Sequence, residues 1–340
     1  MASAHMGAGA ALDPQPLQQM SFAFASSCAL GAAVQLDVFS HIAAGSGTVA
    51  EVARATGATE RGTRMLLDAM TGLGLLSKQD GRYALAPLTA EYLVRGRPNY
   101  IGALMETTYL MDSWSRLADI IRTGNAPHRL ERQQEAEQFF PVLIRTLDVV
   151  NREPARRLAA ALGAGKSRTG LQVLDVACGS GVWGIALAEA DPRSRVTAHD
   201  FPHVLETTRE FLQRHGVEAQ FDFIAGDLKE VDFGESRFDL AVLGNILHTE
   251  GEASSRALLR RLARALKPGG RAVILDMLPN DERTGPAFPL LFALNMLVHS
   301  SEGDTFTLSE YMEWLLEAGF NTAETVDLGG HSPAIIAGKP

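Results

Sequence analysis

The sequence predicts an α/β protein with two parts, and three observations support this fold class. From Leu171 onward, short apolar strands alternate with helices, which is typical of a parallel sheet covered by helices on both faces. The last two apolar stretches, "NTAETVDL" and "SPAIIAGK", are joined by a glycine turn, which predicts a terminal antiparallel hairpin at the edge of that sheet. The N-terminal part is mostly helical and contains the helix, turn, helix and hairpin of a winged helix.

Composition narrows the class of partner. The chain has 340 residues, of which 46% are hydrophobic and 21% charged, so it can bury a substantial core. A net charge of −9 disfavours nucleic acid and anionic membranes, which leaves a small molecule as the expected partner. The two cysteines, Cys28 and Cys178, have no metal-binding spacing and make no disulfide framework. We therefore expect no metal and a cytoplasmic location.

Two further segments bear on location. Residues 1–14, "MASAHMGAGAALDP", lack the charged start and apolar centre of a signal peptide, and we expect a disordered tag there. The longest apolar run, "PAFPLLFALNMLV" from Pro286, is too short to cross a bilayer. No membrane partner is expected.

The N-terminal part begins with apolar residues at helical spacing over 17–44. Thr48 and Glu51 then form a capping box that opens a helix, and Gly57 is a plausible stop. A second helix is expected over 59–70, followed by two short strands around the turn "QDG". Further helices are expected from Asn99 to Leu162, interrupted near "TGNAPHR".

A winged helix either binds DNA or joins two subunits. The second helix carries Arg61 and Arg64 but also Glu60 and Asp68, whereas a helix that reads a DNA groove normally sits in a clearly basic field. We therefore favour dimerisation.

The C-terminal part continues as an alternation of strands and helices. Its expected strands are 171–177, 194–200, 219–227, 238–247 and 271–278. The expected helices are 181–191, 204–216 and 252–270, the last of which is stopped by "KPGG". Thr307 and Glu310 form a capping box that opens a final helix, and Gly319 ends it.

The stretch "LDVACGSGVWG", residues 174–184, carries the chemistry. Gly179, Gly181 and Gly184 spell G-x-G-x-x-G, and Asp200 follows where an acid would bind ribose hydroxyls. This pattern fits either a nicotinamide dinucleotide or another adenosine-bearing cofactor.

Three features favour an adenosine-bearing cofactor other than a nicotinamide dinucleotide. Asp175 precedes the glycines, where its carboxylate would oppose a pyrophosphate but suit a cationic ligand. Asp227, just past the third strand, could bind an adenine amino group. The terminal antiparallel hairpin also departs from a fully parallel dinucleotide-binding sheet.

Almost the whole chain resembles the class I S-adenosylmethionine-dependent methyltransferases, and within them the small-molecule O-methyltransferases that carry an N-terminal winged-helix dimerisation domain. Five stretches carry the resemblance in family order: "VLDVACGSG", "AHDFPHVLE", "AGDLKEVDF", "LGNILHTEGEASSRALLRRLARALKPGG" and "DTFTLSEYMEWLLEAGF". It implies a Rossmann-like catalytic domain over 166–340, a dimerisation domain over 15–98 and a helical linker with substrate-pocket residues over 99–165. It also implies a homodimer, formed through the N-terminal domain, that converts S-adenosyl-L-methionine to S-adenosyl-L-homocysteine.

The resemblance assigns eight cofactor-binding residues. The methionine end of the cofactor would lie on the glycine turn and on the backbone around Asn245. Asp200 would bind the ribose hydroxyls. Phe201, Asp227 and Leu228 would lie beside the adenine. The eight residues are Asp175, Gly179, Gly181, Asp200, Phe201, Asp227, Leu228 and Asn245. Two departures are Ala177–Cys178, where relatives often have glycines, and Gly244, where many plant relatives carry a basic residue.

The resemblance makes His248, in "NILHTEGE", the general base that removes the proton of the acceptor; a capping or core histidine is the alternative. Plant relatives support this histidine with two acids. Asp276 falls one position away from the first, and Thr305 stands where the second would be. Glu250 could orient His248 or face water. If carbon or nitrogen is methylated, the histidine only positions the substrate.

Apolar and aromatic side chains are expected to hold the acceptor, although about half of them could be core. We assign this role to Met105, Tyr109, Trp114, Phe292, Asn295, Met296 and His299. Because methionine adapts to flat irregular ligands, we expect an aromatic or polyketide-like hydroxyl of secondary metabolism. The alternatives are an NAD(P)-dependent oxidoreductase, a winged-helix DNA-binding regulator with a ligand-sensing domain, and a methyltransferase fold with other chemistry.

Overall fold

The computed structural model describes residues 12–106, 108–125, 133–330 and 332–340. Of residues 108–110 and 133–140 it describes the backbone alone. The chain divides into two compact units, Met1–Thr108 and Tyr109–Pro340, and each is described by itself. The functional division at 15–98, 99–165 and 166–340 stays a prediction.

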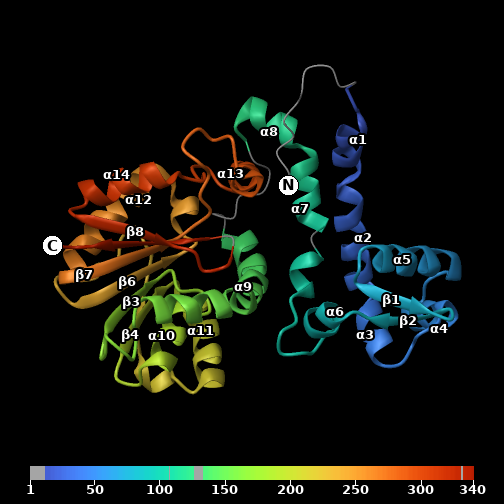
Figure 1. Ribbon diagram of the computed structural model, residues 1–340, viewed down its shortest axis with the longest axis horizontal. Coiled ribbons are helices and arrows are strands. Elements are labelled where there is room, and N and C mark those ends of the chain that lie inside the picture. Colours follow the sequence, from blue (N-terminus) through green and yellow to red (C-terminus); the bar gives the residue numbers. More distant parts are fainter. Residues whose placement is uncertain (1–11, 107, 126–132, 331) are drawn as a thin grey trace. The chain divides into compact units, whose positions relative to one another are not determined.

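The first unit contains the predicted winged helix (Figure 1). Thr48 and Glu51 form the expected capping box, and Gly57 ends the helix in a left-handed conformation. The hairpin is antiparallel and turns at Asp80–Gly81. The elements of this unit are α1 (Gln15–Phe22), α2 (Phe24–Gln35), α3 (Val38–Ala43), α4 (Val49–Thr56), α5 (Glu60–Gly72), β1 (Leu76–Gln79), β2 (Arg82–Leu85), α6 (Pro87–Tyr92) and η1 (Gly102–Met105).

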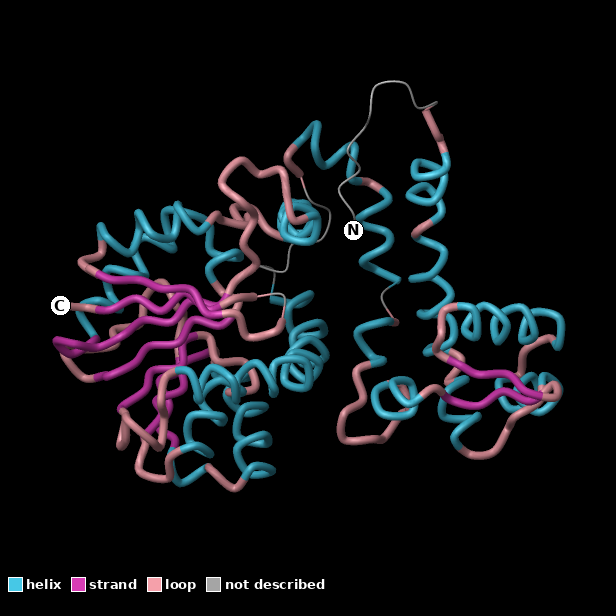
Figure 2. Tube along the Cα trace, viewed as in Figure 1, coloured by secondary structure: helices cyan, strands magenta, loops and turns pink. Residues whose placement is uncertain are grey.

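The second unit is built on a seven-stranded sheet of order β5-β4-β3-β6-β7-β9-β8 (Figure 2). The strands from β5 to β7 are parallel, and β9 runs antiparallel to both β7 and β8, so the predicted terminal hairpin is confirmed. The strands are β3 (Gln172–Val176), β4 (Arg195–Asp200), β5 (Phe221–Ala225), β6 (Phe238–Gly244), β7 (Leu266–Leu275), β8 (Thr322–Val326) and β9 (Ala334–Gly338).

Helices cover both faces of this sheet, as Figure 1 shows for α10 and α11 on one side and α12 and α14 on the other. Alternate residues of each central strand enter opposite cores: Val173 belongs to one and Leu174 to the other, and neither is exposed. The helices of this unit are α7 (Thr108–Ser115), α8 (Leu117–Thr123), α9 (Gln133–Ala161), α10 (Val182–Ala190), α11 (Pro202–His215), α12 (Leu247–Ala265), α13 (Ala287–His299) and α14 (Leu308–Glu317). Residue 331 and the part of "TGNAPHR" from residue 126 on lie outside the described residues.

Around the fourth predicted strand the prediction was partly wrong. Strand β6 ends at Gly244 rather than at Leu247, because Asn245 adopts a left-handed conformation with φ of 58° and turns the chain out of the sheet. A helical turn beginning at Leu247 follows, and a non-helical residue, Gly251 (φ 73°, ψ 170°), separates it from the rest of α12. His248 therefore sits on a short turn of its own at the carboxyl end of β6.

None of the helices in the described ranges is long and apolar enough to cross a membrane.

Candidate active site

Three acids lie along the carboxyl edge of the sheet. Asp175 is the next-to-last residue of β3, Asp200 ends β4, and Asp227 follows the end of β5. These three strands are neighbours in the sheet, so the prediction that the acids share one rim is confirmed. In open α/β sheets this edge is the ligand crevice.

The glycine loop after β3 has a left-handed backbone at Ala177 (φ 49°), Gly179 (φ 56°) and Gly181 (φ 77°). Its conformation is held from β4 and from α11: the Gly179 amide donates to Asp200 Oδ2 at 2.9 Å, and the Thr208 hydroxyl donates to the Gly179 carbonyl at 2.7 Å. Gly181 is the N-cap of α10, so the loop leads directly into a helix N-terminus. The small residue at position 177 preserves the turn, as expected.

Asp200 is half-buried and accepts from two backbone amides, Gly179 at Oδ2 and Phe201 at Oδ1. Burial raises the pKa of its carboxyl, against the effect of these two amides. A carboxylate has about four acceptor positions, so two remain for ligand hydroxyls. The Phe201 ring beside it is 46% exposed and stacks on His203 at 5.9 Å, which leaves a flat apolar surface next to the acid.

Asp175 lies beneath the loop rather than at its surface. It is fully buried, and its Oδ2 accepts from the Gly184 amide at 3.0 Å. Its Oδ1 has no hydrogen-bond partner among the described residues. Burial raises its pKa to about 7, and the negative charge of Asp200 adds to this effect. Two enclosed carboxyl groups beside one loop favour a ligand that carries positive charge, and the spare acceptors of Asp200 suit a ribose.

The remaining predicted cofactor residues are placed as follows. Asp227 is exposed and its Oδ1 caps a turn by accepting from the Lys229 amide at 2.8 Å. The Leu228 side chain is buried in the core beside α12. The Asn245 amide donates to the Leu275 carbonyl at 2.8 Å, and its Oδ1 accepts from the Ser332 hydroxyl at 3.0 Å.

Gly244 departs from the expected basic residue for a steric reason. A Cβ atom placed on Gly244 would collide with the indole nitrogen of Trp183, the second residue of α10. Trp183 is 5% exposed and packs in the core on the α10 side of the sheet. The indole thus takes the space that a side chain at position 244 would need.

His248 and Asp276 form a buried pair at the same edge. The Nδ1 atom of His248 lies 2.7 Å from Asp276 Oδ1, and the two side chains are 7% and 1% exposed. Because an ionised carboxylate only accepts, Nδ1 carries the proton and the lone pair of the neutral ring resides on Nε2. The His248 backbone amide also donates to Asp276 Oδ2 at 3.1 Å. Asp276 therefore holds both the backbone and the ring of His248.

Asp276 accepts four hydrogen bonds from the residues that the structure describes. Besides the two from His248, the Met277 amide donates to Oδ1 at 2.9 Å and the Tyr311 hydroxyl donates to Oδ2 at 2.9 Å. Sequence reasoning missed Tyr311. It occupies an apolar position of α14 and reads as a core aromatic; the one signal was that a buried tyrosine hydroxyl needs a partner.

The other two candidates for supporting His248 have other partners. Glu250 accepts from the Ser254 hydroxyl at 2.7 Å and lies 3.9 Å from Lys229 Nζ. Thr305 is fully buried and donates to the Pro289 carbonyl at 3.2 Å.

Of the predicted substrate residues on α13, Phe292 lies beside His248. The Phe292 ring meets the His248 ring edge to face at 5.1 Å, and Phe288 lies 6.1 Å from Phe292. Asn295 is half-buried, whereas Met296 and His299 are buried on the same helix.

The predicted residues outside α13 are less closely tied to the site. Trp114 is half-buried on α7. The backbone of Tyr109 belongs to α7, and its side chain lies outside the described part of the structure. Met105 packs against the core of the first unit.

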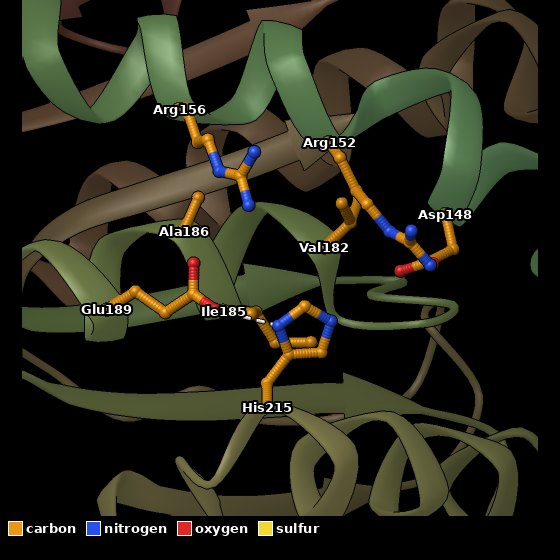
Figure 3. Close-up of a pocket in the computed structure, with 8 residues that line it drawn as sticks. All are labelled: Asp148, Arg152, Arg156, Val182, Ile185, Ala186, Glu189 and His215. Carbon is orange, nitrogen blue, oxygen red and sulfur yellow. Dashed lines mark hydrogen bonds and ion pairs between the residues drawn. The ribbon is translucent and has the colours of Figure 1, made fainter. Parts of the chain in front are cut away.

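A shallow surface pocket lies away from this edge (Figure 3). Side chains of α9, α10 and α11 line it, including Arg156, Glu189 and His215. Its cavity volume of about 10 Å³ holds no more than one water molecule. It is therefore not a substrate pocket. Among the residues described, no three His, Cys, Asp or Glu side chains form a group that could hold a metal ion.

Comparison with known proteins identifies the family. Residues 159–321 match the model of the O-methyltransferase domain, and residues 18–95 match that of the O-methyltransferase dimerisation domain. The tetracenomycin polyketide synthesis 8-O-methyltransferase of Streptomyces glaucescens is 32% identical over 96% of this chain and 97% of its own length. The 3-hydroxy-5-methyl-1-naphthoate 3-O-methyltransferase of Streptomyces sahachiroi is 32% identical over 87% of this chain and 86% of its own.

Among solved structures, human N-acetylserotonin methyltransferase in complex with S-adenosylmethionine superposes with a TM-score of 0.80 at 28% identity, covering 98% of this chain and 99% of that one. The matches decide against the oxidoreductase and DNA-regulator alternatives. The chain belongs to the family of S-adenosylmethionine-dependent O-methyltransferases.

Proposed function

We propose that the protein methylates a phenolic hydroxyl of an aromatic, polyketide-like secondary metabolite, with His248 as the general base. The observation that carries this proposal is the buried His248–Asp276 pair at the cofactor edge, with its ring packed against Phe292. The acceptor class comes from the names of two relatives, a methyltransferase of tetracenomycin polyketide synthesis and a hydroxynaphthoate O-methyltransferase.

The proposed cofactor contacts follow from the geometry of the rim. Asp200 binds the ribose hydroxyls through its free acceptor positions, and the exposed Phe201 ring lies against the adenine. The turn around Gly179 and Gly181 supports the methionine part, and Asp227, Leu228 and the Asn245 backbone complete the site. Asp175 contributes from beneath the loop, through the Gly184 amide and its own charge. When bound, S-adenosylmethionine supplies a methyl group already activated by the sulfonium.

His248 then removes one proton. With Nδ1–H donating to Asp276, Nε2 presents its lone pair to the acceptor hydroxyl and takes the proton as the oxygen becomes nucleophilic. Asp276 stabilises the resulting imidazolium and keeps the ring in place. Proton removal by a positioned base contributes about 10²–10⁴-fold in rate. Glu250 supports the turn that carries His248 by accepting a hydrogen bond from the Ser254 hydroxyl.

Alignment of the acceptor is the second contribution. Phe292, Asn295, Met296 and His299 on α13 would position a flat ring and exclude water beside His248. Trp114, Tyr109 and Met105 stay proposed contacts of the acceptor. Holding acceptor and methyl in line contributes on the order of 7–11 kcal/mol in favourable cases.

We also propose a cytoplasmic homodimer. The dimerisation-domain match supports the assembly, and α1 and the start of α2 expose large apolar side chains: Leu17, Met20, Phe22 and Phe24 are 55% to 73% exposed. A contiguous apolar surface of this kind favours association with a second copy. The two cysteines, both free thiols, suit the reducing cytoplasm.

The test uses a panel of hydroxynaphthoates with a cofactor labelled with ¹³C in its methyl group. A methoxy carbon in the product, together with release of S-adenosylhomocysteine, is the expected result. The His248→Ala variant should bind S-adenosylhomocysteine normally and lose about 10²–10⁴-fold in kcat. His215→Ala, which removes the ring that pairs with Glu189 on the far side of α10, is the matched control and should retain activity. Full activity of His248→Ala would overturn the base assignment.

A further inference from the structure

We propose that Tyr311 is a positioning residue for the His248–Asp276 pair: its hydroxyl holds the carboxylate in the orientation that keeps His248 competent as a base. This inference rests on the proposed function of His248. It gives His248 a second supporting residue besides Asp276. Thr305, which stands where the relatives have a second acid, instead donates to the Pro289 carbonyl.

The three polar groups form a chain. The Tyr311 hydroxyl donates to Asp276 Oδ2 at 2.9 Å, and the other oxygen, Oδ1, accepts from His248 Nδ1 at 2.7 Å. The two oxygens of Asp276 are thus tied to two different elements, α14 through Tyr311 and the turn after β6 through His248.

Among the described residues, Tyr311 is the only donor to Asp276 other than His248 and the adjacent Met277. Of the four donors, two belong to His248 and one is the amide of the next residue, Met277. Without the tyrosine hydroxyl, Oδ2 would be held by the His248 amide alone. The carboxylate could then rotate, and with it the imidazole that it orients.

The tyrosine is itself held rigidly. Its side chain has 0% exposure, and its ring packs edge to face on Phe306 at 5.9 Å and on Trp314 at 5.2 Å. The capping box of Thr307 and Glu310 fixes the first turn of α14, where Tyr311 begins the second. The hydroxyl therefore has a defined place relative to Asp276.

The hydroxyl also remains a donor at every working pH. Burial raises the pKa of Tyr311 well above its ordinary value, and the negative charge of Asp276 raises it further. Tyr311 therefore stays protonated while His248 cycles between its neutral and charged forms. It supports the carboxylate in both states without exchanging a proton.

The test compares two variants that each remove one tyrosine–aspartate hydrogen bond, buried at Tyr311 and part-buried at Tyr83. Tyr311→Phe removes the bond to Asp276. Tyr83→Phe removes the 2.8 Å bond to Asp68 in the first unit, where Tyr83 is 3% exposed, and serves as the matched control. Tyr311→Phe, which loses the more buried bond, should lose at least as much thermal stability as Tyr83→Phe, whereas activity should fall in Tyr311→Phe alone. We expect about a tenfold loss of kcat, with KM and S-adenosylhomocysteine affinity within about twofold.

The pH dependence separates positioning from a general structural defect. As the pH approaches the ionisation of the naphthoate hydroxyl, the acceptor no longer needs a base, so the deficit of Tyr311→Phe should shrink between pH 7 and pH 9.5. A deficit that stays constant with pH, or no deficit at all, would overturn the inference. If Tyr311→Phe does not fold, Tyr311→Met, whose flexible side chain adapts to the cavity, should show the same pattern.

His248→Ala, assayed in the same series, keeps the two proposals apart. If it retains activity, the proposed base is wrong. If it loses activity while Tyr311→Phe matches the wild type, His248 stands as the base and Tyr311 is only a core residue.

Discussion

Asp276 Oδ1 lies 2.7 Å from His248 Nδ1, although 28 residues separate the two in the sequence. Because the pair is buried, water does not compete for its hydrogen bond. Asp276→Asn keeps the shape but removes the charge that stabilises the imidazolium and fixes the tautomer. We expect kcat to fall about 10²–10⁴-fold while S-adenosylhomocysteine affinity is retained. Asp281→Asn, at an exposed acid near α14, is the control in steady-state assays; near-normal kcat in Asp276→Asn would contradict the assignment.

Asp200→Asn should weaken cofactor binding rather than catalysis at saturation. The substitution removes the charged acceptor proposed for the ribose hydroxyls and disturbs the bond to the Gly179 amide. Each hydrogen bond to a charged group contributes about 1.5–3 kcal/mol, so we expect at least a tenfold increase in Kd by calorimetry. Asp222→Asn, on the exposed side of the neighbouring strand, should leave Kd unchanged. Equal affinities for both variants would remove Asp200 from the cofactor site.

Asp175 should make the stability of the cofactor-free protein decrease as the pH rises. Burial raises its pKa to about 7 from the ordinary 3.8, so the folded chain binds this proton more tightly than the unfolded chain. The stability that this proton gives to the folded chain is fully present below about pH 4 and is lost as the pH rises to about 7. The side chain of Asp175→Asn cannot ionise. The free energy of unfolding of this variant at pH 8 should therefore be higher than that of the wild type by on the order of 2–4 kcal/mol.

Urea titrations at pH 5 and pH 8 test this expectation. The difference between Asp175→Asn and the wild type should be larger at pH 8 than at pH 5. A pH-independent difference would show that Asp175 does not titrate in this range.

Gly244→Ala should destabilise the second unit, because its new methyl group collides with the Trp183 indole. Overpacking of this kind costs about 1–3 kcal/mol. Gly72→Ala, on α5, is the matched control: a Cβ there meets nothing within 4 Å, and alanine favours a helix by up to about 1 kcal/mol. Thermal unfolding of both variants measures the contrast; a neutral Gly244→Ala would mean that the indole moves aside without cost.

Local sequence signals predicted much of the fold. The capping boxes at Thr48 and Thr307 begin α4 and α14 as expected, because their donors and acceptors lie within four residues of one another. The alternation of strands and helices placed the acids on one rim, since parallel strands share the direction of their ends. These features depend on neighbours in the chain or on a general rule of topology.

The site itself depends on contacts between distant segments. Glu250 is close to His248 in the sequence, yet Asp276 is the acid that contacts it, because β6 and β7 are adjacent in the sheet. The support from Tyr311 was not predictable, because an aromatic at a core position of α14 carries no sign of its partner. The left-handed backbone of Asn245, which ends β6 early, was equally hidden in an apolar run.

The contact between Trp183 and Gly244 gives the cofactor edge an intrinsic fluorophore. An indole packed against the residue that precedes Asn245 senses changes in polarity at this edge, whereas Trp314 is enclosed under Arg256 in a separate core. Emission from Trp183 therefore offers a label-free optical readout of ligand occupancy at this edge.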